Sequence, residues 1–277
     1  MAAWRFPIEP APVSDEFECR LHGEVPYRCV LVHGGPGAAG GLRPVAERLS
    51  SSFGVVEHLQ ARPTVDGQIE GLAACVAAHS RGPIVLVGYS WGAWLALLAA
   101  ARRPRLASKL ILVSSGPLTS EFAHMTMKTR QSRMTDDERK DYQALVSVIE
   151  GDGPERNAAL TELGTLIERI DSYRLLPVRA EHSVSVDARI FESVWTEASA
   201  LRESGALLNG LSSVRCPITV MHGIDDPHPL DGVRIHVLQS SPSASIIVLE
   251  KCGHSPWRES FAHEAFHGLL HAEIGST

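Results

Sequence analysis

Six short apolar runs, each rich in β-branched residues and bounded by glycine or proline, recur along the chain of 277 residues. They are continuous rather than alternating, as expected for strands that are buried on both faces. The runs are Arg28–Val32, Val55–Leu59, Ile84–Val87, Leu110–Val113, Ile218–Met221 and Ile246–Leu249. Helical patterns lie between most of them or after the last, at Gln68–His79, Trp91–Arg102, Leu230–Leu238 and Phe261–Ala272. Strands that alternate with helices predict an α/β fold, with a mostly parallel sheet covered by helices.

The alternation breaks between Val113 and Ile218, where the sequence shows no convincing strand. Residues 135–138 read TDDE, a capping box that opens a helix running to about Glu150. Two further helices are predicted there, at Glu155–Ile170 and Asp187–Glu203. A structureless loop of roughly a hundred residues is implausible within a compact domain. We therefore expect a helical cap at 117–213, inserted in a core formed by 1–116 and 214–277.

The net charge, the apolar runs and the cysteine spacing indicate which partners and which compartment to expect. The formal net charge is −6 and no basic stripe stands out, which disfavours nucleic acid or a membrane as partner. Residues Met1–Pro10 lack the basic start and apolar run of a signal peptide, and the apolar stretch Leu95–Ala101 is too short to span a bilayer. The five cysteines are widely spaced with no C-x-x-C pair, which favours a reducing compartment. We expect a cytoplasmic protein with a small-molecule substrate, and the sequence leaves its oligomeric state open.

The strand at residues 84–87 runs directly into Gly88-Tyr89-Ser90-Trp91-Gly92, a G-x-S-x-G turn followed by an apolar helix. A serine on such a sharp strand-to-helix turn sits in a strained backbone with its hydroxyl exposed. The free N–H groups of the helix N-terminus favour a developing negative charge. A plain glycine-serine connection is the bland alternative, but the flanking strand and helix favour Ser90 as a nucleophile.

The first run ends in His33-Gly34-Gly35-Pro36-Gly37, a glycine-rich strand end. An acyl-transfer site needs two backbone donors for the oxyanion, one after the nucleophile and one from an earlier strand-end loop. Pro36 has no N–H to donate. The amides of Gly35 and Trp91 are therefore the predicted oxyanion hole.

Thirteen histidines are available as a base, so chain order selects among them. On this architecture the order is serine, then an acid, then histidine. His254 lies in the loop after the last predicted strand, and Asp225 and Asp226 follow the strand before it. Neighbouring side chains of an extended loop point apart, so only one of the two aspartates can face His254. Spacing alone does not choose between them.

Four segments together resemble the α/β-hydrolase superfamily: HGGPG at 33–37, GYSWG at 88–92, HGIDDP at 222–227 and GHSPW at 253–257. The HGGPG element is similar to that of proline iminopeptidases. The resemblance covers the core on both sides of the cap and implies a sheet of about eight strands, with the cap inserted after the sixth. Its H-G-x-x-D and G-H-x-P patterns imply Asp226 as the acid and His254 as the base.

The chain departs from the iminopeptidase pattern at two places. The D-x-R-G-x-G-x-S segment is absent, since residues 60–64 read QARPT. The cap also lacks a clear acidic cluster that would bind a free amine. Glu121, Glu192 and Glu197 are candidates, but each is better explained as a solvated helix charge.

A competing pattern lies near the C-terminus, where residues 263–267 read HEAFH and match the H-E-x-x-H signature of zinc proteases. Little chain follows it to supply a third ligand and a cleft, so we interpret it as a partly exposed helix face. No dinucleotide or phosphate-binding motif appears, and neither a cofactor nor a metal is expected. Tyr89, Trp195 and Trp257 are candidates for an apolar substrate pocket, although packing of the cap explains Trp195 equally well.

These patterns predict a serine hydrolase that cleaves a small, partly apolar carboxylic ester, or a related acyl compound, through an acyl-enzyme. An aminopeptidase similar to the proline iminopeptidases is one alternative. A ligand-binding protein that retains the triad with little turnover is another, because the same residues would be present.

Overall fold

The computed structural model describes residues 13–14, 18–177 and 184–276, so the reading of Met1–Pro10 lies outside the described residues. Eight strands form one sheet in the order β1-β2-β5-β3-β6-β7-β9-β10. They are β1 (Val13–Ser14), β2 (Cys19–His22), β3 (Tyr27–Val32), β5 (Gly54–His58), β6 (Ile84–Tyr89), β7 (Ala107–Val113), β9 (Ile218–Gly223) and β10 (Ser245–Leu249). Strands β5 to β10 pair in parallel, and β1 and β2 form an antiparallel edge. The predicted, mostly parallel sheet is confirmed.

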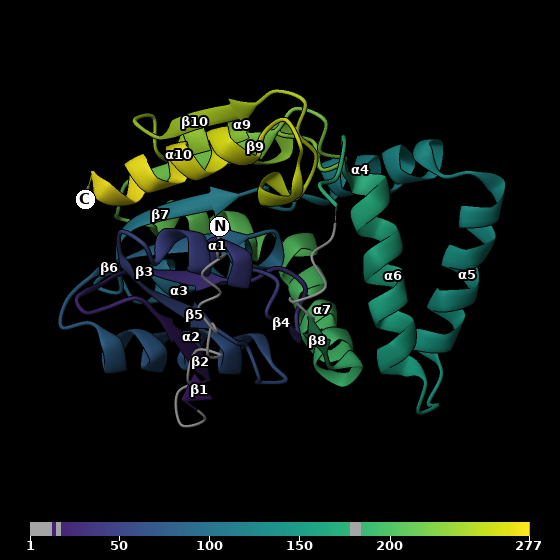
Figure 1. Cartoon of the computed structure of the whole chain (residues 1–277), viewed down its shortest axis with the longest axis horizontal. Coiled ribbons are helices and arrows are strands. Elements are labelled where there is room, and N and C mark those ends of the chain that lie inside the picture. Colours follow the sequence, from purple (N-terminus) through teal and green to yellow (C-terminus); the bar gives the residue numbers. More distant parts are fainter. Residues whose placement is uncertain (1–12, 15–17, 178–183, 277) are drawn as a thin grey trace, which may run out of the picture.

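Helices cover both faces of this sheet (Figure 1). On one face, α1 (Arg43–Leu49) and α10 (His263–Gly275) bury their apolar sides against the strands. On the other face lie α2 (Val65–His79), α3 (Trp91–Arg102) and α9 (Asp231–Ser240). Helix α2 begins three residues before the predicted start because Thr64 caps it, with its hydroxyl accepting a hydrogen bond from the amide of Gly67.

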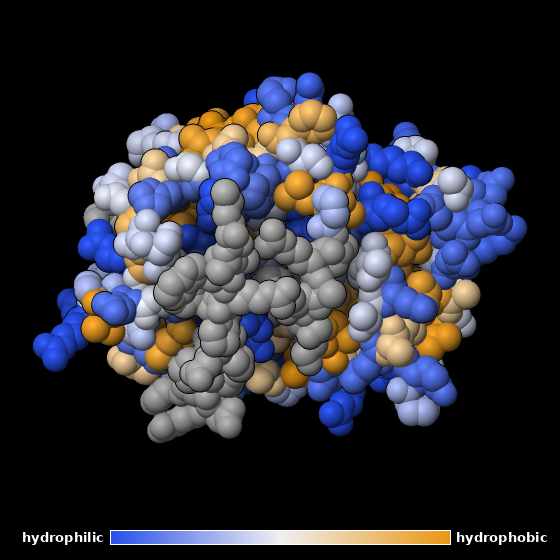
Figure 2. All heavy atoms as spheres, viewed as in Figure 1, coloured by the Kyte–Doolittle hydropathy of each residue, from blue (hydrophilic) through white to orange (hydrophobic). Residues whose placement is uncertain are grey.

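Five helices lie between β7, the sixth strand of the large sheet along the chain, and β9. They are α4 (Ser120–Arg133), α5 (Asp136–Glu150), α6 (Arg156–Asp171), α7 (Ala188–Glu203) and α8 (Ala206–Ser213). The capping box of α5 is present, with Thr135 and Glu138 bonded reciprocally. Helices α5 and α6 form a hairpin at the right of Figure 1, and hydrophilic atoms cover its upper end in Figure 2. The last helix, α8, buries Leu207 and Leu211 in the same apolar cluster as α3.

The expectation of no strand between Val113 and Ile218 is wrong. Strand β8 (Ser185–Val186) pairs antiparallel with β4 (Ala38–Ala39) as a separate two-stranded sheet. A two-residue strand is too short to show a period in sequence. For the same reason the short edge strands β1 and β2 were not predicted. Helices α1, α4 and α8 were also not predicted, since α1 and α8 are short and α4 carries a single buried residue, Thr126.

Within the described ranges, no helix combines the length and apolar character needed to cross a bilayer.

Candidate active site

Ser90 lies on the turn between β6 and α3, with backbone angles φ 54° and ψ −118°. This left-handed conformation is strained for a residue with a side chain, and the surrounding packing maintains it. A Cβ on Gly92 would lie 2.1 Å from the carbonyl oxygen of Val32, and one on Gly88 would lie 2.3 Å from that of Gly92. Both glycines of the G-x-S-x-G turn are therefore required by the close approach of α3 to β3 and β6.

The serine and the two other predicted residues meet at the carboxyl ends of the parallel strands. Nε2 of His254 lies 3.0 Å from Oγ of Ser90, and Nδ1 of the same ring lies 2.8 Å from Oδ2 of Asp226. Both are hydrogen-bond distances. Asp226 follows β9 and His254 follows β10, so adjacent strands deliver the two side chains to one edge of the sheet.

Asp226, rather than Asp225, faces the histidine. The backbone of Asp225 is bonded elsewhere: its amide donates to the carbonyl of Cys252, and its carbonyl accepts from the Arg133 guanidinium. Of the two aspartates that spacing left open, Asp226 is therefore the one whose carboxylate lies beside His254.

The carboxylate of Asp226 is surrounded by three histidines. Besides His254, Nδ1 of His228 lies 2.8 Å from Oδ1, and Nε2 of His222 lies 3.5 Å from Oδ2. Burial alone would raise the pKa of Asp226, but the three imidazoles hold it well below its ordinary value. The carboxylate is therefore ionised at neutral pH, as a partner for an imidazolium must be.

His228 is a residue that sequence reasoning missed. Its amide and ring both donate to Asp226, and its ring stacks on His254 with centroids 4.2 Å apart. Burial lowers its pKa to about 4, so the ring is neutral at pH 7. It occupies one carboxylate oxygen of Asp226 and leaves the other to His254. The only sequence clue was its position two residues after the aspartate.

The glycine-rich loop after β3 lies over the nucleophile. A Cβ on Gly34 would lie 2.9 Å from Cβ of Ser90, so the loop backbone approaches the serine closely. Among the described residues, none accepts a hydrogen bond from the amide of Gly35 or from that of Trp91. The two amides predicted as an oxyanion hole are thus without acceptors in the part of the chain that the structure describes.

Gln60, a second residue missed from the sequence, connects this loop to α3. Its side-chain amide donates to the carbonyl of His33 at 2.6 Å, and its oxygen accepts from the Trp91 indole at 2.8 Å. Gln60 is fully buried and has a positive φ of 53°. It follows β5 where the iminopeptidase pattern has a different segment, so no motif marked it.

The three predicted pocket residues occupy different places. The Tyr89 ring lies 5.1 Å from that of His254, and its hydroxyl lies 2.8 Å from Oγ of Ser255. Trp257 is buried behind Tyr89, with ring centroids 4.6 Å apart, and packs in the core. Tyr89 therefore borders the site directly, whereas Trp257 supports it from beneath.

Trp195, on the cap helix α7, is 38% exposed and stacks on Trp94 of α3 with centroids 5.9 Å apart. The Phe191 ring also stacks on Trp195, and the Trp94 ring centroid in turn lies 6.3 Å from that of Trp91. The packing explanation of Trp195 and the pocket explanation are thus compatible, because the row of rings ends at the residue beside Ser90.

The cap also contacts the loop that carries His254. The amide of His254 donates to the backbone carbonyl of Asp171, the last residue of α6. The Asp171 carboxylate is buried and pairs with Arg130 of α4, with Nε to Oδ1 at 2.8 Å. Burial alone would lower the pKa of Arg130, but the Asp171 carboxylate raises it overall. The position of the histidine thus depends on a buried ion pair within the cap.

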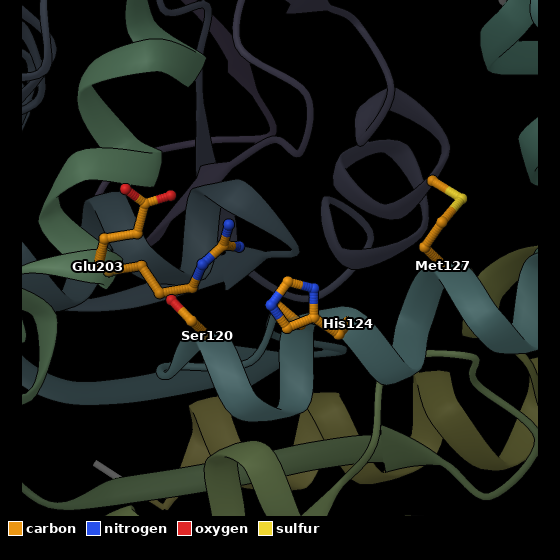
Figure 3. A pocket seen from close by; sticks show the side chains of 6 residues that line it. Ser120, His124, Met127 and Glu203 are labelled. Carbon is orange, nitrogen blue, oxygen red and sulfur yellow. The ribbon is translucent and has the colours of Figure 1, made fainter.

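A cavity of about 370 Å³ lies between α4 and the end of α7 (Figure 3). Its lining residues are Ser120, Ala123, His124, Met127, Arg202 and Glu203. None of the predicted site residues is among them. The Arg202 guanidinium lies over the Trp94 ring at 5.5 Å, so the cavity adjoins the aromatic row that begins beside the serine.

In the H-E-x-x-H helix, the first histidine and the glutamate contact other protein groups. Nδ1 of His263 lies 2.8 Å from the carbonyl oxygen of Trp257, and Glu264 pairs with Arg48. His267 is buried rather than on an exposed face, and burial lowers its pKa to about 4. In the part of the chain that the structure describes, three ligand atoms gather only at Asp226, His228 and His254 and at Cys19, Cys75 and His79.

A serine on a strand-to-helix turn, in reach of a histidine–aspartate pair, is the arrangement of an α/β-fold hydrolase. A model of the alpha/beta hydrolase family matches residues 21–267. The chain therefore belongs to the alpha/beta hydrolase family, a family of enzymes.

Solved structures share this fold. VinJ superposes with a TM-score of 0.66 at 20% identity, covering 93% of this chain and 94% of that chain. A thermophilic esterase from Thermogutta terrifontis gives 0.62 at 18% identity, covering 93% and 92%. E-2-(Acetamidomethylene)succinate hydrolase gives 0.60 at 17% identity, covering 94% of each chain. No curated protein matches the sequence significantly.

Proposed function

We propose that this protein is a serine hydrolase that cleaves a small, partly apolar carboxylic ester or related acyl compound. The observation that carries the proposal is the chain of contacts from Ser90 through His254 to Asp226, at 3.0 and 2.8 Å. Geometry of this kind, rather than sequence position, defines a nucleophile, a base and an orienting acid.

In the first step, Oγ of Ser90 attacks the substrate carbonyl while Nε2 of His254 takes its proton. The ionised Asp226 stabilises the imidazolium that forms. The imidazolium then protonates the leaving alkoxide as the tetrahedral intermediate collapses to an acyl-serine. A water molecule, deprotonated by His254, adds to the acyl group, and the carboxylic acid leaves as the proton returns to Ser90.

The amides of Gly35 and Trp91 are the proposed donors to the oxyanion of both tetrahedral intermediates. Their lack of acceptors among the described residues, and the close approach of this loop to Ser90, support that role. One such donor is typically worth on the order of 3 kcal/mol of transition-state stabilisation.

Two of the three candidate cap acids are engaged with protein groups, which favours an ester over an aminoacyl amide. Glu192 pairs with Arg156, and Glu197 accepts a hydrogen bond from the amide of Val65 at 2.7 Å. The third, Glu121, is exposed near the start of α4. The Tyr89 ring and the row of tryptophans offer apolar surface near the serine.

The test is labelling with a fluorophosphonate probe, read by intact mass, with Ser90→Ala, His254→Ala and the matched control Ser115→Ala. Ser115 is a buried serine that bonds to the carbonyl of Gly116. We expect one adduct on the wild type and on the control, none on Ser90→Ala, and strongly slowed labelling of His254→Ala.

Turnover of short esters and of aminoacyl arylamides then separates the alternatives. Faster cleavage of esters supports the proposal, whereas preference for the arylamides would favour the aminopeptidase. A folded wild type that is neither labelled nor active would contradict the proposal and favour a ligand-binding protein.

A further inference from the structure

Three soft donor atoms converge at the edge of the sheet, away from Ser90. Cys19 is the first residue of β2, and Cys75 and His79 lie one turn apart on α2. Their ligand atoms all lie within 4.8 Å of one another, and Sγ of Cys19 is 4.0 Å from Nε2 of His79. Both cysteines are fully buried and His79 is half-buried.

The imidazole of His79 is oriented as a ligand would be. Its Nδ1 lies 2.9 Å from the backbone carbonyl of Cys75, so Nδ1 carries the proton and Nε2 turns its lone pair toward the sulfurs. Metal-bound histidines commonly donate their other ring N–H to a carbonyl in this way. The Tyr27 ring packs edge-on against the imidazole at 5.8 Å and restricts its rotation.

A carboxylate oxygen lies beside the same face of α2. Oε2 of Glu18 is buried and accepts no hydrogen bond from the described residues, while Oε1 lies 3.3 Å from Nε of Arg62. A Cβ on Gly71, one turn before Cys75, would lie 3.3 Å from Oε2, which places this oxygen along the helix face that carries the ligands. A buried carboxylate oxygen without a donor is costly unless a cation balances it.

We propose that Cys19, Cys75 and His79 bind a thiophilic divalent cation of the zinc type, with a water molecule between the ion and Glu18 as the fourth ligand. Two thiolates and one imidazole are a donor set that Zn²⁺ prefers, and four ligands give its tetrahedral coordination. Binding releases the two thiol protons to solvent. Two thiolates, one carboxylate, a divalent cation and the Arg62 guanidinium then sum to zero charge.

A disulfide between the two cysteines fits the surroundings less well. It would leave the buried Oε2 of Glu18, which has no hydrogen-bond partner among the described residues, without a balancing cation. Both sulfurs are also fully buried, which hinders an oxidant after folding, whereas a metal ion can be taken up as the chain folds. The site would pin the edge strand β2 to α2, which is a structural role independent of hydrolysis at Ser90.

The test uses full-length untagged protein, expressed in zinc-replete medium and purified without chelators, with metal content measured by mass spectrometry. We expect about one zinc ion per chain in the wild type, as in structural zinc sites. The content should fall at least tenfold in Cys19→Ser, Cys75→Ser and His79→Gln. Cys29→Ser, at an equally buried cysteine outside the cluster, and His263→Gln, in the H-E-x-x-H helix, should keep it.

A second measurement needs only the wild type, so it holds even where variants fail to fold. Cobalt(II) added to the apoprotein should produce sulfur-to-cobalt charge-transfer bands and tetrahedral ligand-field bands. A chelator should lower the melting temperature of the wild type but not that of His79→Gln. Absence of stoichiometric zinc and of the cobalt bands would overturn the proposal. Full metal content in His79→Gln would do the same, as would a Cys19–Cys75 disulfide forming under peroxide in protein that takes up no metal.

Discussion

On one side of the cap, α4 and α6 reach the loops of Asp226 and His254 through charged groups and backbone hydrogen bonds. Arg130 pairs with the buried Asp171, whose carbonyl accepts the amide of His254, and Arg133 donates to the carbonyl of Asp225. On the other side, α7 meets the core through buried apolar side chains and stacked rings. Ser193 donates a hydrogen bond to the carbonyl of Pro63, and Glu197 accepts one from the amide of Val65.

The two sides of the cap therefore contribute to the active site in different ways. Bonds to charged groups are short and directional, and losing one partner leaves a buried charge, so the first side fixes where the imidazole stands. Stacked rings tolerate offsets at small cost, so the second side can adapt to the shape of a substrate. We therefore expect substitutions on the first side to change kcat and stability, and substitutions on the second side to change KM.

The largest effect on activity is expected from replacing Asp226, the acid that lies beside the loops contacted by α4 and α6. Asp226→Asn should lower kcat/KM by roughly 10³–10⁴-fold, because the neutral amide no longer stabilises the imidazolium and favours the wrong tautomer of His254. Asp225→Asn is the control, since the contact with Arg133 uses only its backbone, and it should stay within a few-fold of the wild type. Equal losses in the two variants would refute the assignment of the acid.

The second largest effect is expected from breaking the buried ion pair between Arg130 and Asp171. Arg130→Met leaves the Asp171 carboxylate buried without a partner and should lower the free energy of unfolding by about 3–5 kcal/mol, measured by urea titration. The value of kcat should fall as well, because α6 loses its hold on the His254 loop. Arg130→Met combined with Asp171→Asn should recover part of the stability. A decrease of less than about 1 kcal/mol in the free energy of unfolding is typical of an exposed ion pair. It would show that α4 and α6 hold the active-site loops no more rigidly than α7 does.

A smaller effect is expected on the stability of the fold at acidic pH. We attribute it to His267 in the core rather than to a residue of the cap. The pKa of His267 is lowered to about 4 by burial, below the value of roughly 6.5 in an unfolded chain. The unfolded state therefore binds the proton first, and stability present above about pH 6.5 is lost as the pH falls toward 4.

Replacement of this histidine provides the measurement. Nδ1 of His267 is buried without a hydrogen-bond partner among the described residues, so His267→Leu removes a titrating group without breaking a bond of that atom. Between pH 6.5 and 4 the variant should lose about 1–3 kcal/mol less than the wild type in urea titrations. His271→Leu, at an exposed position of the same helix, should follow the wild type. Parallel curves for His267→Leu and the wild type would place the acid sensitivity elsewhere.

The smallest effect is expected on the aromatic side. Trp195→Leu removes both ring stacks and should cost about 1 kcal/mol of stability, because the side chain is already 38% exposed. KM for an apolar ester should rise several-fold with kcat nearly unchanged. Tyr173→Leu, an exposed ring that contacts Phe261 on the charged side, should leave KM unaltered. A fall in kcat for Trp195→Leu would mean that this side also positions the reacting groups.

Local features of the sequence were sufficient to predict the parallel sheet, the turn that carries the serine and the order of the candidate residues along the chain. The parallel strands were found because buried strands are continuous apolar runs, and Ser90 because the G-x-S-x-G turn lies between a strand and a helix. His254 and the pair of aspartates followed from their places after the last two strands. Each of these predictions depends on neighbours within a few residues along the chain.

The remaining features depend on which distant segments pack together. Gln60 links two loops, His228 stacks on a ring from another strand end, and Asp171 reaches the His254 loop from the end of a cap helix. Cys19 and Cys75, widely spaced in sequence, have neighbouring sulfur atoms only because α2 packs against the edge strand β2. No local pattern encodes these contacts, since a hydrogen bond or a metal shell is defined by the distance between atoms and not by their separation along the chain.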